Sequence, residues 1–282
     1  MSEEFTVNDP TTETQWRSLI LFGKNSATYK FAFAKSLLEL ANDETTIITL
    51  DELAEPFSKH IIEHLKVHDK QGNSSSSQFL NACRARINNE ITQDELIRTT
   101  ISKGFVNVVD AFQNIGGGTI TNPFYEKNYS NKSKQLIITN ELIGLKEHYQ
   151  YRNLGDEVEA RWRLVETAWN IGLSPNLIEV QYDTNNDELY LETDLMSRVD
   201  VAHARGSLNG YQKGKCFYCC SDISIDTGSE DICHVDHLLP HAHKIQHLPA
   251  NINGVWNLVL SCSICNSMAE KGVKIPEVKY LY

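Results

Sequence analysis

Apolar residues recur at helical spacing through most of the first two-thirds of the chain. Residues 29–41 form an apolar segment that follows two N-cap candidates, Asn25 and Ser26, and ends at a polar pair. A second amphipathic segment has Pro56 near its start, where proline fits a first helical turn. A short helix is expected around residues 79–87. These patterns predict a mostly helical N-terminal region.

Two further helices are predicted from more specific signals. Thr92 and Glu95 have the spacing of a capping box, which predicts a helix start at this point. Residues 154–172 combine a strong 3.6-residue periodicity with a terminal glycine, Gly172. The apolar residues on one face of this helix are Val158, Trp162, Val165 and Trp169.

Strand patterns are fewer, and they lie mostly later in the chain. Residues 134–139 form a short strand candidate, and residues 176–193 alternate around a turn-rich centre as a hairpin does. The glycine run 116–118 lacks the strand–GxxxxGK[ST]–helix context of a phosphate loop. We expect an α+β protein with a mostly helical domain over residues 1–175. A hairpin, a linker helix and a second domain would then occupy residues 176–282.

Charge limits the classes of partner. The net charge is −11, and residues 200–282 hold seven basic against eight acidic side chains, so the rest of the chain carries −10. Such a chain does not coat nucleic acid through a global basic field. A local basic patch, a metal ion or a partner protein must offset the repulsion if it contacts DNA or RNA. The acidic N-terminal region suits protein contact better than DNA contact.

The chain shows no membrane or export signal. No apolar run approaches the roughly 18 residues that a membrane span needs. The first residues are acidic and polar, unlike a signal peptide. We therefore expect a cytoplasmic protein without membrane contact.

Six of the seven cysteines fall in the last third of the chain. Two CxxC pairs, Cys216/Cys219 and Cys262/Cys265, are separated by 42 residues. A CxxC turn lets two thiolates converge on one ion, and two such turns supply the four ligands of a structural zinc. Cys220 and Cys233 leave the ligand set open, because either one could replace an assigned ligand.

Between the cysteine pairs lies CHVDHLLPHAHKIQHLP, residues 233–249, with five histidines. The segment Asp236-His237-Leu238-Leu239-Pro240, then Asn257, then Asn266 and Lys271 after the second CxxC, follow in a fixed order. This order resembles that of the HNH, or ββα-metal, nuclease family in its zinc-stabilised form. The resemblance covers roughly residues 210–275 and implies a ββα-metal domain with a structural zinc.

The resemblance also implies a role for each matching residue. Asp236 would be a ligand of a catalytic divalent metal, His237 the general base, and Asn266 the second ligand. Asn257 would orient the histidine loop through hydrogen bonds to the backbone. The family often has histidine where Asn266 stands, and an amide oxygen is a harder ligand that favours Mg²⁺ or Mn²⁺.

Three basic residues are candidates for contact with the nucleic-acid backbone. Lys271 follows the last signature residue, and Lys215 and Arg205 lie in a modest basic stretch leading into the first CxxC. The alternative to nucleic-acid contact, for each of the three, is that the side chain is a solvated surface cation. The other histidines of the cluster, including His234, are more simply structural or solvated than metal ligands.

Together these features predict a metal-dependent endonuclease that hydrolyses DNA phosphodiester bonds. The alternative is a catalytically silent zinc module that binds nucleic acid or a partner protein. By association with chains that join a helical region to an HNH domain, a bacterial restriction or anti-phage defence effector is expected. Its N-terminal region would then dock on a sensor or ATPase.

Overall fold

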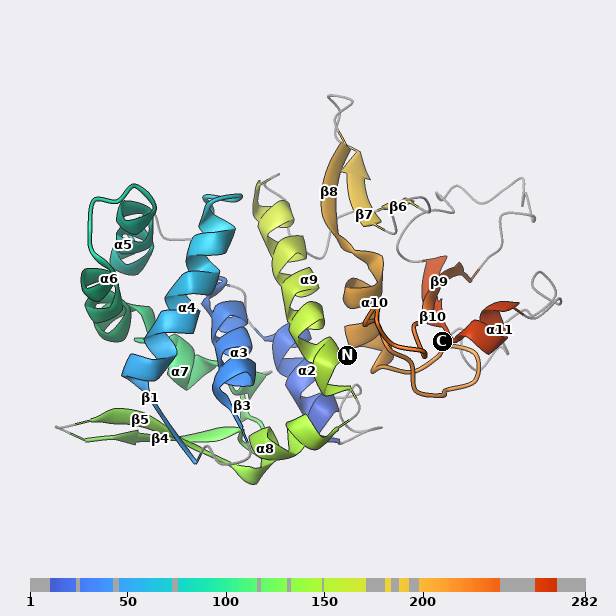
Figure 1. Cartoon of the computed structure of the whole chain (residues 1–282), viewed down its shortest axis with the longest axis horizontal. Coiled ribbons are helices and arrows are strands. Elements are labelled where there is room, and N and C mark those ends of the chain that lie inside the picture. Colours follow the sequence, from blue (N-terminus) through green and yellow to red (C-terminus); the bar gives the residue numbers. More distant parts are fainter. Residues whose placement is uncertain are drawn as a thin grey trace. The chain divides into compact units, whose positions relative to one another are not determined.

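A computed structural model of the chain describes residues 11–23, 26–42, 46–72, 76–115, 118–130, 133–148, 150–170, 181–183, 188–192, 198–238 and 257–267. Helices and small antiparallel sheets alternate, so the fold is α+β (Figure 1). The chain divides into two compact units. The first comprises Met1–Tyr151 with Trp169–Ile171, and the second comprises Arg152–Ala168 with Gly172–Tyr282. Most of the helix over residues 151–170 thus belongs to the second unit, whereas we placed it before a boundary at residue 175. The assignment of domain roles stays a prediction.

The first unit is built mainly from helices. These are α2 (Thr12–Phe22), α3 (Tyr29–Leu40), α4 (Leu50–Leu65), α5 (Gln78–Ile87), α6 (Gln93–Thr99), the π-helix η1 (Thr100–Gly104), α7 (Val108–Ala111) and α8 (Asn140–Glu147). The predicted capping box at the start of α6 is confirmed: Thr92 Oγ1 accepts from the Glu95 N–H, and the Glu95 carboxylate accepts from the Thr92 N–H.

Two helix starts differ from expectation. The N-cap of α3 is Thr28, beyond both residues that we considered. Helix α4 begins at Leu50, ahead of the expected start, because Thr49 and Glu52 form a capping box that the sequence analysis overlooked. Pro56 therefore lies inside the helix. The capping hydrogen bonds, 2.8 Å from the Thr49 N–H and 3.2 Å to Thr49 Oγ1, satisfy two backbone N–H groups at this end.

A three-stranded antiparallel sheet packs against these helices. Its order is β1 (Ile47–Thr49), β5 (Lys134–Ile138) and β4 (Tyr125–Tyr129), and α4 packs on β1 and β5 (Figure 1). The buried face carries Ile48, Leu136 and Ile138, while Ile47 and Ile137 pair on the exposed face. We predicted only β5 from the sequence. A separate hairpin, β2 (Asn114–Ile115) and β3 (Gly118–Thr119), flanks the glycine run.

Aromatic side chains dominate the core of the first unit. The ring of Trp16 meets Phe124 edge-on at 5.2 Å, and Phe33 meets Phe112 at 5.1 Å. The buried Gln113 side chain accepts from the Phe124 N–H at 2.6 Å. Edge-to-face pairs of this kind add to the stabilisation that burial of the rings supplies.

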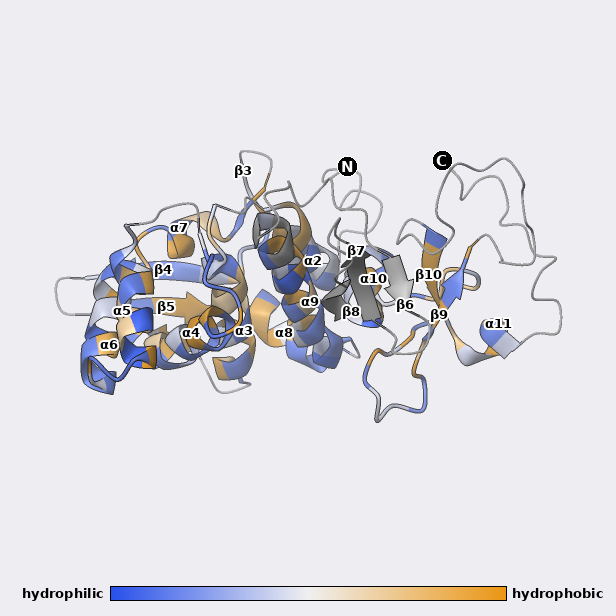
Figure 2. Ribbon diagram, turned by 90° about the horizontal axis from the view of Figure 1, so that it is seen from above, coloured by the Kyte–Doolittle hydropathy of each residue, from blue (hydrophilic) through white to orange (hydrophobic). Residues whose placement is uncertain are grey.

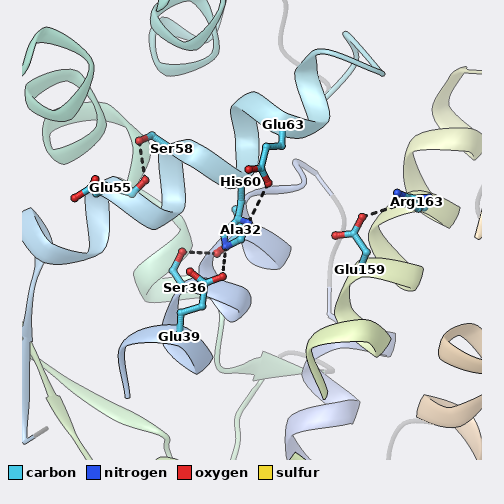
Figure 3. A network of polar contacts seen from close by, with 9 residues as sticks. All are labelled: Ala32, Ser36, Glu39, Glu55, Ser58, His60, Glu63, Glu159 and Arg163. Atoms are coloured by element: carbon cyan, nitrogen blue, oxygen red, sulfur yellow. Dashed lines mark hydrogen bonds and ion pairs between the residues drawn. The ribbon is translucent and has the colours of Figure 1, made fainter. Parts of the chain in front are cut away.

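Two buried polar side chains of this unit, Lys30 and His60, have hydrogen-bond partners. Lys30 Nζ donates to the carbonyls of Ile20 at 3.1 Å and Gly23 at 2.7 Å, so a cation caps the C-terminal end of α2. The buried His60 imidazole hydrogen-bonds Glu39 at 2.7 Å and lies 3.8 Å from Glu63 (Figure 3). Burial raises the pKa of the Cys83 thiol to about 12, which makes it an inert core residue.

The second unit contains helix α9 (Tyr151–Asn170) and a three-stranded sheet of β6 (Gln181–Asp183), β7 (Glu188–Glu192) and β8 (Arg198–His203). The predicted hairpin is confirmed as β6–β7, and β8 adds a strand that we did not expect. Then follow α10 (Ala204–Gln212), the pair β9 (His234–His237) and β10 (Leu258–Ser261), and the short helix α11 (Ser263–Ser267). The strand β10 is mostly hydrophobic (Figure 2).

Helix α9 is joined to α10 and to the cysteine-bearing loops by close packing and hydrogen bonds. A Cβ on Gly206 would lie 3.1 Å from the carbonyl oxygen of Asp156, so only glycine permits this approach of the two helices without a shift. Asn153 Oδ1 accepts from the Ile225 N–H at 3.3 Å. A shared core unites α9, α10 and the strands: Ala160, Ala204, Leu208, Cys216, Ile223, Ile225, Cys233, Leu258 and Leu260.

Candidate metal centre and catalytic strand

The chain reverses sharply between α10 and the first cysteine pair. Lys213 and Gly214 both have positive φ angles, 57° and 70°, so the helix ends in two successive left-handed residues. The Cys220 N–H then donates to the Cys216 carbonyl at 2.9 Å, which closes the CxxC turn. Cys220 itself has φ 59°, a conformation that favours glycine. The local backbone thus turns both cysteines of the pair toward one point.

The two CxxC pairs come together as predicted. The Sγ atoms of Cys216, Cys219, Cys262 and Cys265 all lie within 4.8 Å of one another. The Cys219 and Cys262 sulfurs are 3.8 Å apart. A tetrahedral zinc with bonds of about 2.3 Å has sulfur–sulfur edges of about 3.8 Å. The four cysteines are therefore arranged to bind one tetrahedral ion.

Hydrogen bonds from the surrounding chain support the sulfurs of this four-cysteine centre. The Cys262 N–H donates to Cys216 Sγ at 3.3 Å, and the Cys265 N–H donates to Cys262 Sγ at 3.4 Å. The hydrogen bond from Ser221 lowers the pKa of the Cys219 thiol to about 6. Burial raises the pKa of the Cys216 and Cys265 thiols. Binding of an ion must therefore displace protons from the centre.

The structure shows which of the six cysteines of this region belong to the four-cysteine centre. Cys220 is exposed and lies outside the cluster, and its neighbour Cys219 supplies the sulfur instead. Cys233 is fully buried in the core of the second unit, with other apolar side chains around it. Neither of the two possible substitutes is part of the group, so the paired spacing identifies the ligands.

The signature residues Asp236 and His237 lie on β9, which pairs with β10 in an antiparallel register. Asp236 is opposite Val259 and His237 is opposite Leu258, without an irregularity between them. Side chains alternate along a regular strand, so adjacent residues belong to opposite faces. Helix α11 follows β10 directly and packs against β9, which gives the element order strand, strand, helix.

The Asp236 carboxylate is held by two donors. The Tyr218 hydroxyl donates to its Oδ2 at 3.2 Å, and the His237 N–H donates to its Oδ1 at 3.0 Å. Burial, together with the negative charge of Asp236, raises the pKa of the Tyr218 phenol. Sequence reasoning did not select Tyr218. The available signal was its position between two predicted zinc ligands. Spacing alone, however, cannot show that Tyr218 contacts Asp236, which lies 18 residues further along the chain.

The two asparagines of the signature are both close to this strand pair. Asn257 is fully buried. Its backbone carbonyl accepts a hydrogen bond of 2.8 Å from the N–H of Leu238, the residue after His237. Asn266 lies on α11. Its Oδ1 is buried and accepts no hydrogen bond from the residues that the structure describes. A buried amide oxygen left without a donor fits a role as a ligand of a cation.

The predicted nucleic-acid contacts are only partly described. Lys215 Nζ pairs with Asp222 at 2.7 Å, and Arg205 Nε donates to the Cys233 carbonyl at 2.9 Å. Lys271 lies outside the described residues, as do three of the five histidines, at positions 241, 243 and 247. His234 opposes Ser261 in the strand pair. Substrate contact by any of these residues stays a prediction.

A surface cavity between α9, α10 and the loop after Ile225 also includes Arg205. Its charged lining residues are Asp156, Glu159, Arg163, Arg205 and Asp226. Three carboxylates and two arginines line the cavity. Arg163 pairs with Glu159 at 3.0 Å (Figure 3). This lining does not favour a phosphate group.

Comparisons with protein-family models, curated proteins and solved structures found no significant match for this chain. Within the described residues, every helix is too short or too polar to cross a lipid bilayer. What is shown is therefore a C-terminal unit with a four-cysteine cluster suited to zinc, next to a strand that carries Asp236 and His237.

Proposed function

We propose that this protein is a metal-dependent endonuclease of the HNH type, which hydrolyses phosphodiester bonds of DNA. The observation that carries the proposal is the placement of Asp236 and His237. They are adjacent on β9, paired with β10 and followed by α11, within a loop bounded by the four-cysteine centre. The buried Oδ1 of Asn266 on α11 supports the same reading.

In this proposal His237 takes a proton from a water molecule that attacks the phosphorus in line. The bond from phosphorus to the 3′ oxygen breaks and the 3′ oxygen takes a proton from solvent, which leaves a 5′-phosphate and a 3′-hydroxyl. A neutral imidazole is suited to this role near pH 7. Asp236 and Asn266 would hold a Mg²⁺ or Mn²⁺ ion, which would supply charge neutralisation at the scissile phosphate. The side chain of Asn257 would orient the histidine loop through hydrogen bonds to the backbone.

The zinc of the four-cysteine centre has a separate, structural role in this proposal. Its four protein ligands fill a tetrahedron, and a catalytic zinc keeps an open position for water or substrate. Zinc would therefore stabilise the fold of the domain. The hard oxygen ligands of Asp236 and Asn266 would instead bind Mg²⁺ or Mn²⁺.

The test is incubation of supercoiled plasmid DNA with the full-length protein in Mg²⁺ or Mn²⁺. The wild type is compared with His237→Ala and with the matched control His234→Ala on the same strand. The proposal requires cleavage by the wild type and by His234→Ala, and loss of cleavage in His237→Ala. Equal cleavage by all three proteins, or loss only in His234→Ala, contradicts the assignment of His237 as the base.

The alternative is a zinc module that binds nucleic acid or a partner protein without cleaving. One observation favours its partner-protein form: the described basic candidates Lys215 and Arg205 already contact Asp222 and the Cys233 carbonyl, which makes them less suited to bind phosphate. Binding of DNA by the wild type without cleavage in either metal would support this alternative. Co-purification from a bacterial host then tests for a sensor or ATPase of a restriction or anti-phage system, docked on the acidic N-terminal region.

A further inference from the structure

Tyr218 occupies a position that joins the two parts of the candidate site. It lies between Cys216 and Cys219, in the middle of the first CxxC turn. Its ring packs against the core of the second unit and meets the Phe217 ring edge-on at 5.4 Å. Its hydroxyl reaches β9 and donates to Asp236 Oδ2 at 3.2 Å.

We propose that Tyr218 is a positioning residue that orients the Asp236 carboxylate, and so links the four-cysteine centre to the divalent-metal site. The inference rests on the proposed function, since it assigns Asp236 to a catalytic metal. It adds a residue and a coupling between the two sites that the sequence signature does not contain.

The geometry explains how this orientation arises. A carboxylate rotates freely about its χ2 angle unless both of its oxygens are held. In Asp236 the phenol holds Oδ2 and the His237 N–H holds Oδ1, from two different directions. A phenol with an ordinary pKa near 10 is a donor at neutral pH. Hydrogen bonds to ligating carboxylates fix ligand orientation and strongly affect metal affinity.

The coupling to the cysteines follows from the backbone of the first CxxC turn. Cys216 and Cys219 flank Tyr218, and their sulfurs lie within 4.8 Å of those of the second pair. An ion bound by the four sulfurs fixes the turn and, with it, the direction of the phenol. Loss of that ion would free Tyr218 and release one of the two donors to Asp236.

The test measures binding of Mn²⁺ to zinc-loaded full-length protein, by electron paramagnetic resonance of free Mn²⁺ in the absence of DNA. Tyr218→Phe keeps the ring and its packing but removes the donor. We expect about tenfold weaker Mn²⁺ binding. Zinc content and the thermal unfolding midpoint should match the wild type, which a purely structural role of the hydroxyl would not predict. Tyr211→Phe, an exposed tyrosine of the same unit, is the matched control and should bind Mn²⁺ as the wild type does.

A double-mutant cycle with Asp236→Asn separates the possible outcomes. If Tyr218 acts through Asp236, Tyr218→Phe causes no further loss of Mn²⁺ affinity in the Asp236→Asn background. Wild-type affinity in Tyr218→Phe, or an equal loss in both backgrounds, overturns the positioning role and leaves the proposed function intact. Unchanged Mn²⁺ affinity in Asp236→Asn itself overturns the metal site, and both proposals fail together.

Discussion

The side-chain amide of Asn209 donates a hydrogen bond of 2.6 Å to the carboxylate of Glu157, and both residues are buried. This contact joins α10 to α9 inside the second unit. Hydrogen bonds to buried charged groups contribute about 1.5–3 kcal/mol. We therefore expect Asn209→Ala to lower the free energy of unfolding by about 2 kcal/mol, measured by urea denaturation. Tyr211→Phe on the same helix should change it by less than about 0.5 kcal/mol; similar values for the two variants would contradict this role.

The same packing predicts that the C-terminal domain does not fold from residue 176 onward. A fragment of residues 176–282 lacks Asn153, Glu157 and Ala160, which α9 contributes to the second unit. We expect the fragment to show no cooperative thermal transition, whereas the full-length chain does. A cooperative transition in the fragment would show that α9 is dispensable for folding and would support the predicted boundary at residue 175.

Removal of one ligand of the four-cysteine centre should release its ion. Cys262→Ser is expected to reduce zinc, measured by plasma mass spectrometry, from one ion per chain to well below one. The loss should be accompanied by a lower unfolding midpoint, because the ion binds only the folded state. Cys83→Ala removes a cysteine far from the cluster in the sequence and should retain one zinc. Full zinc content in Cys262→Ser would show that these four cysteines do not bind the ion.

Cys220 offers a test of the backbone geometry next to the same centre. Its φ of 59° is in the left-handed region, which costs a non-glycine residue about 1 kcal/mol. We expect Cys220→Gly to keep one zinc per chain and to unfold at the same or higher temperature. Cys220→Val should be less stable, since a β-branched residue is poorly tolerated there. Loss of zinc in Cys220→Gly would show that Cys220 is a ligand.

His60 predicts a pH dependence of stability. Burial and the charge of Lys35 lower the pKa of His60, against the opposing effect of Glu39 and Glu63. The unfolded chain, with a His60 pKa near 6.5, then binds the proton more readily than the folded chain. The free energy of unfolding should fall as the pH drops from about 6.5 through the pKa of the folded state. Urea denaturation at several pH values should show a smaller fall for His60→Gln than for the wild type; an equal fall would exclude His60 as a cause.

Local sequence signals predicted those features that depend on neighbours along the chain. The spacing of Thr92 and Glu95 predicted the start of α6, and the paired CxxC spacing predicted the four ligands. The start of α4 was missed, although Thr49 and Glu52 have the same spacing, because Pro56 was taken to mark a first helical turn. Capping-box spacing thus predicts a helix start correctly only when it is weighed against other local signals, such as a nearby proline.

Features that depend on the folded arrangement were not predictable in the same way. Strand β8 was read as part of a basic stretch, although Val199 and Val201 alternate with polar residues as a strand requires. The exclusion of Cys233 from the ligand set depends on its burial in a core formed by distant elements. The approach of Tyr218 to Asp236 depends on the antiparallel pairing of β9 with β10, which no spacing rule encodes.

The four-cysteine centre also has a consequence for the stability of β9. An ion shared by Cys216 and Cys262 closes a loop of 46 residues, and β9 lies inside that loop. Because the ion binds only the folded state, its binding free energy stabilises the fold of the segment that this loop encloses. The β9–β10 ribbon has only four paired positions, and each residue in them loses about 1–2 kcal/mol of backbone entropy on folding. Binding of an ion by the four cysteines would thus offset part of the backbone entropy that β9 loses on folding.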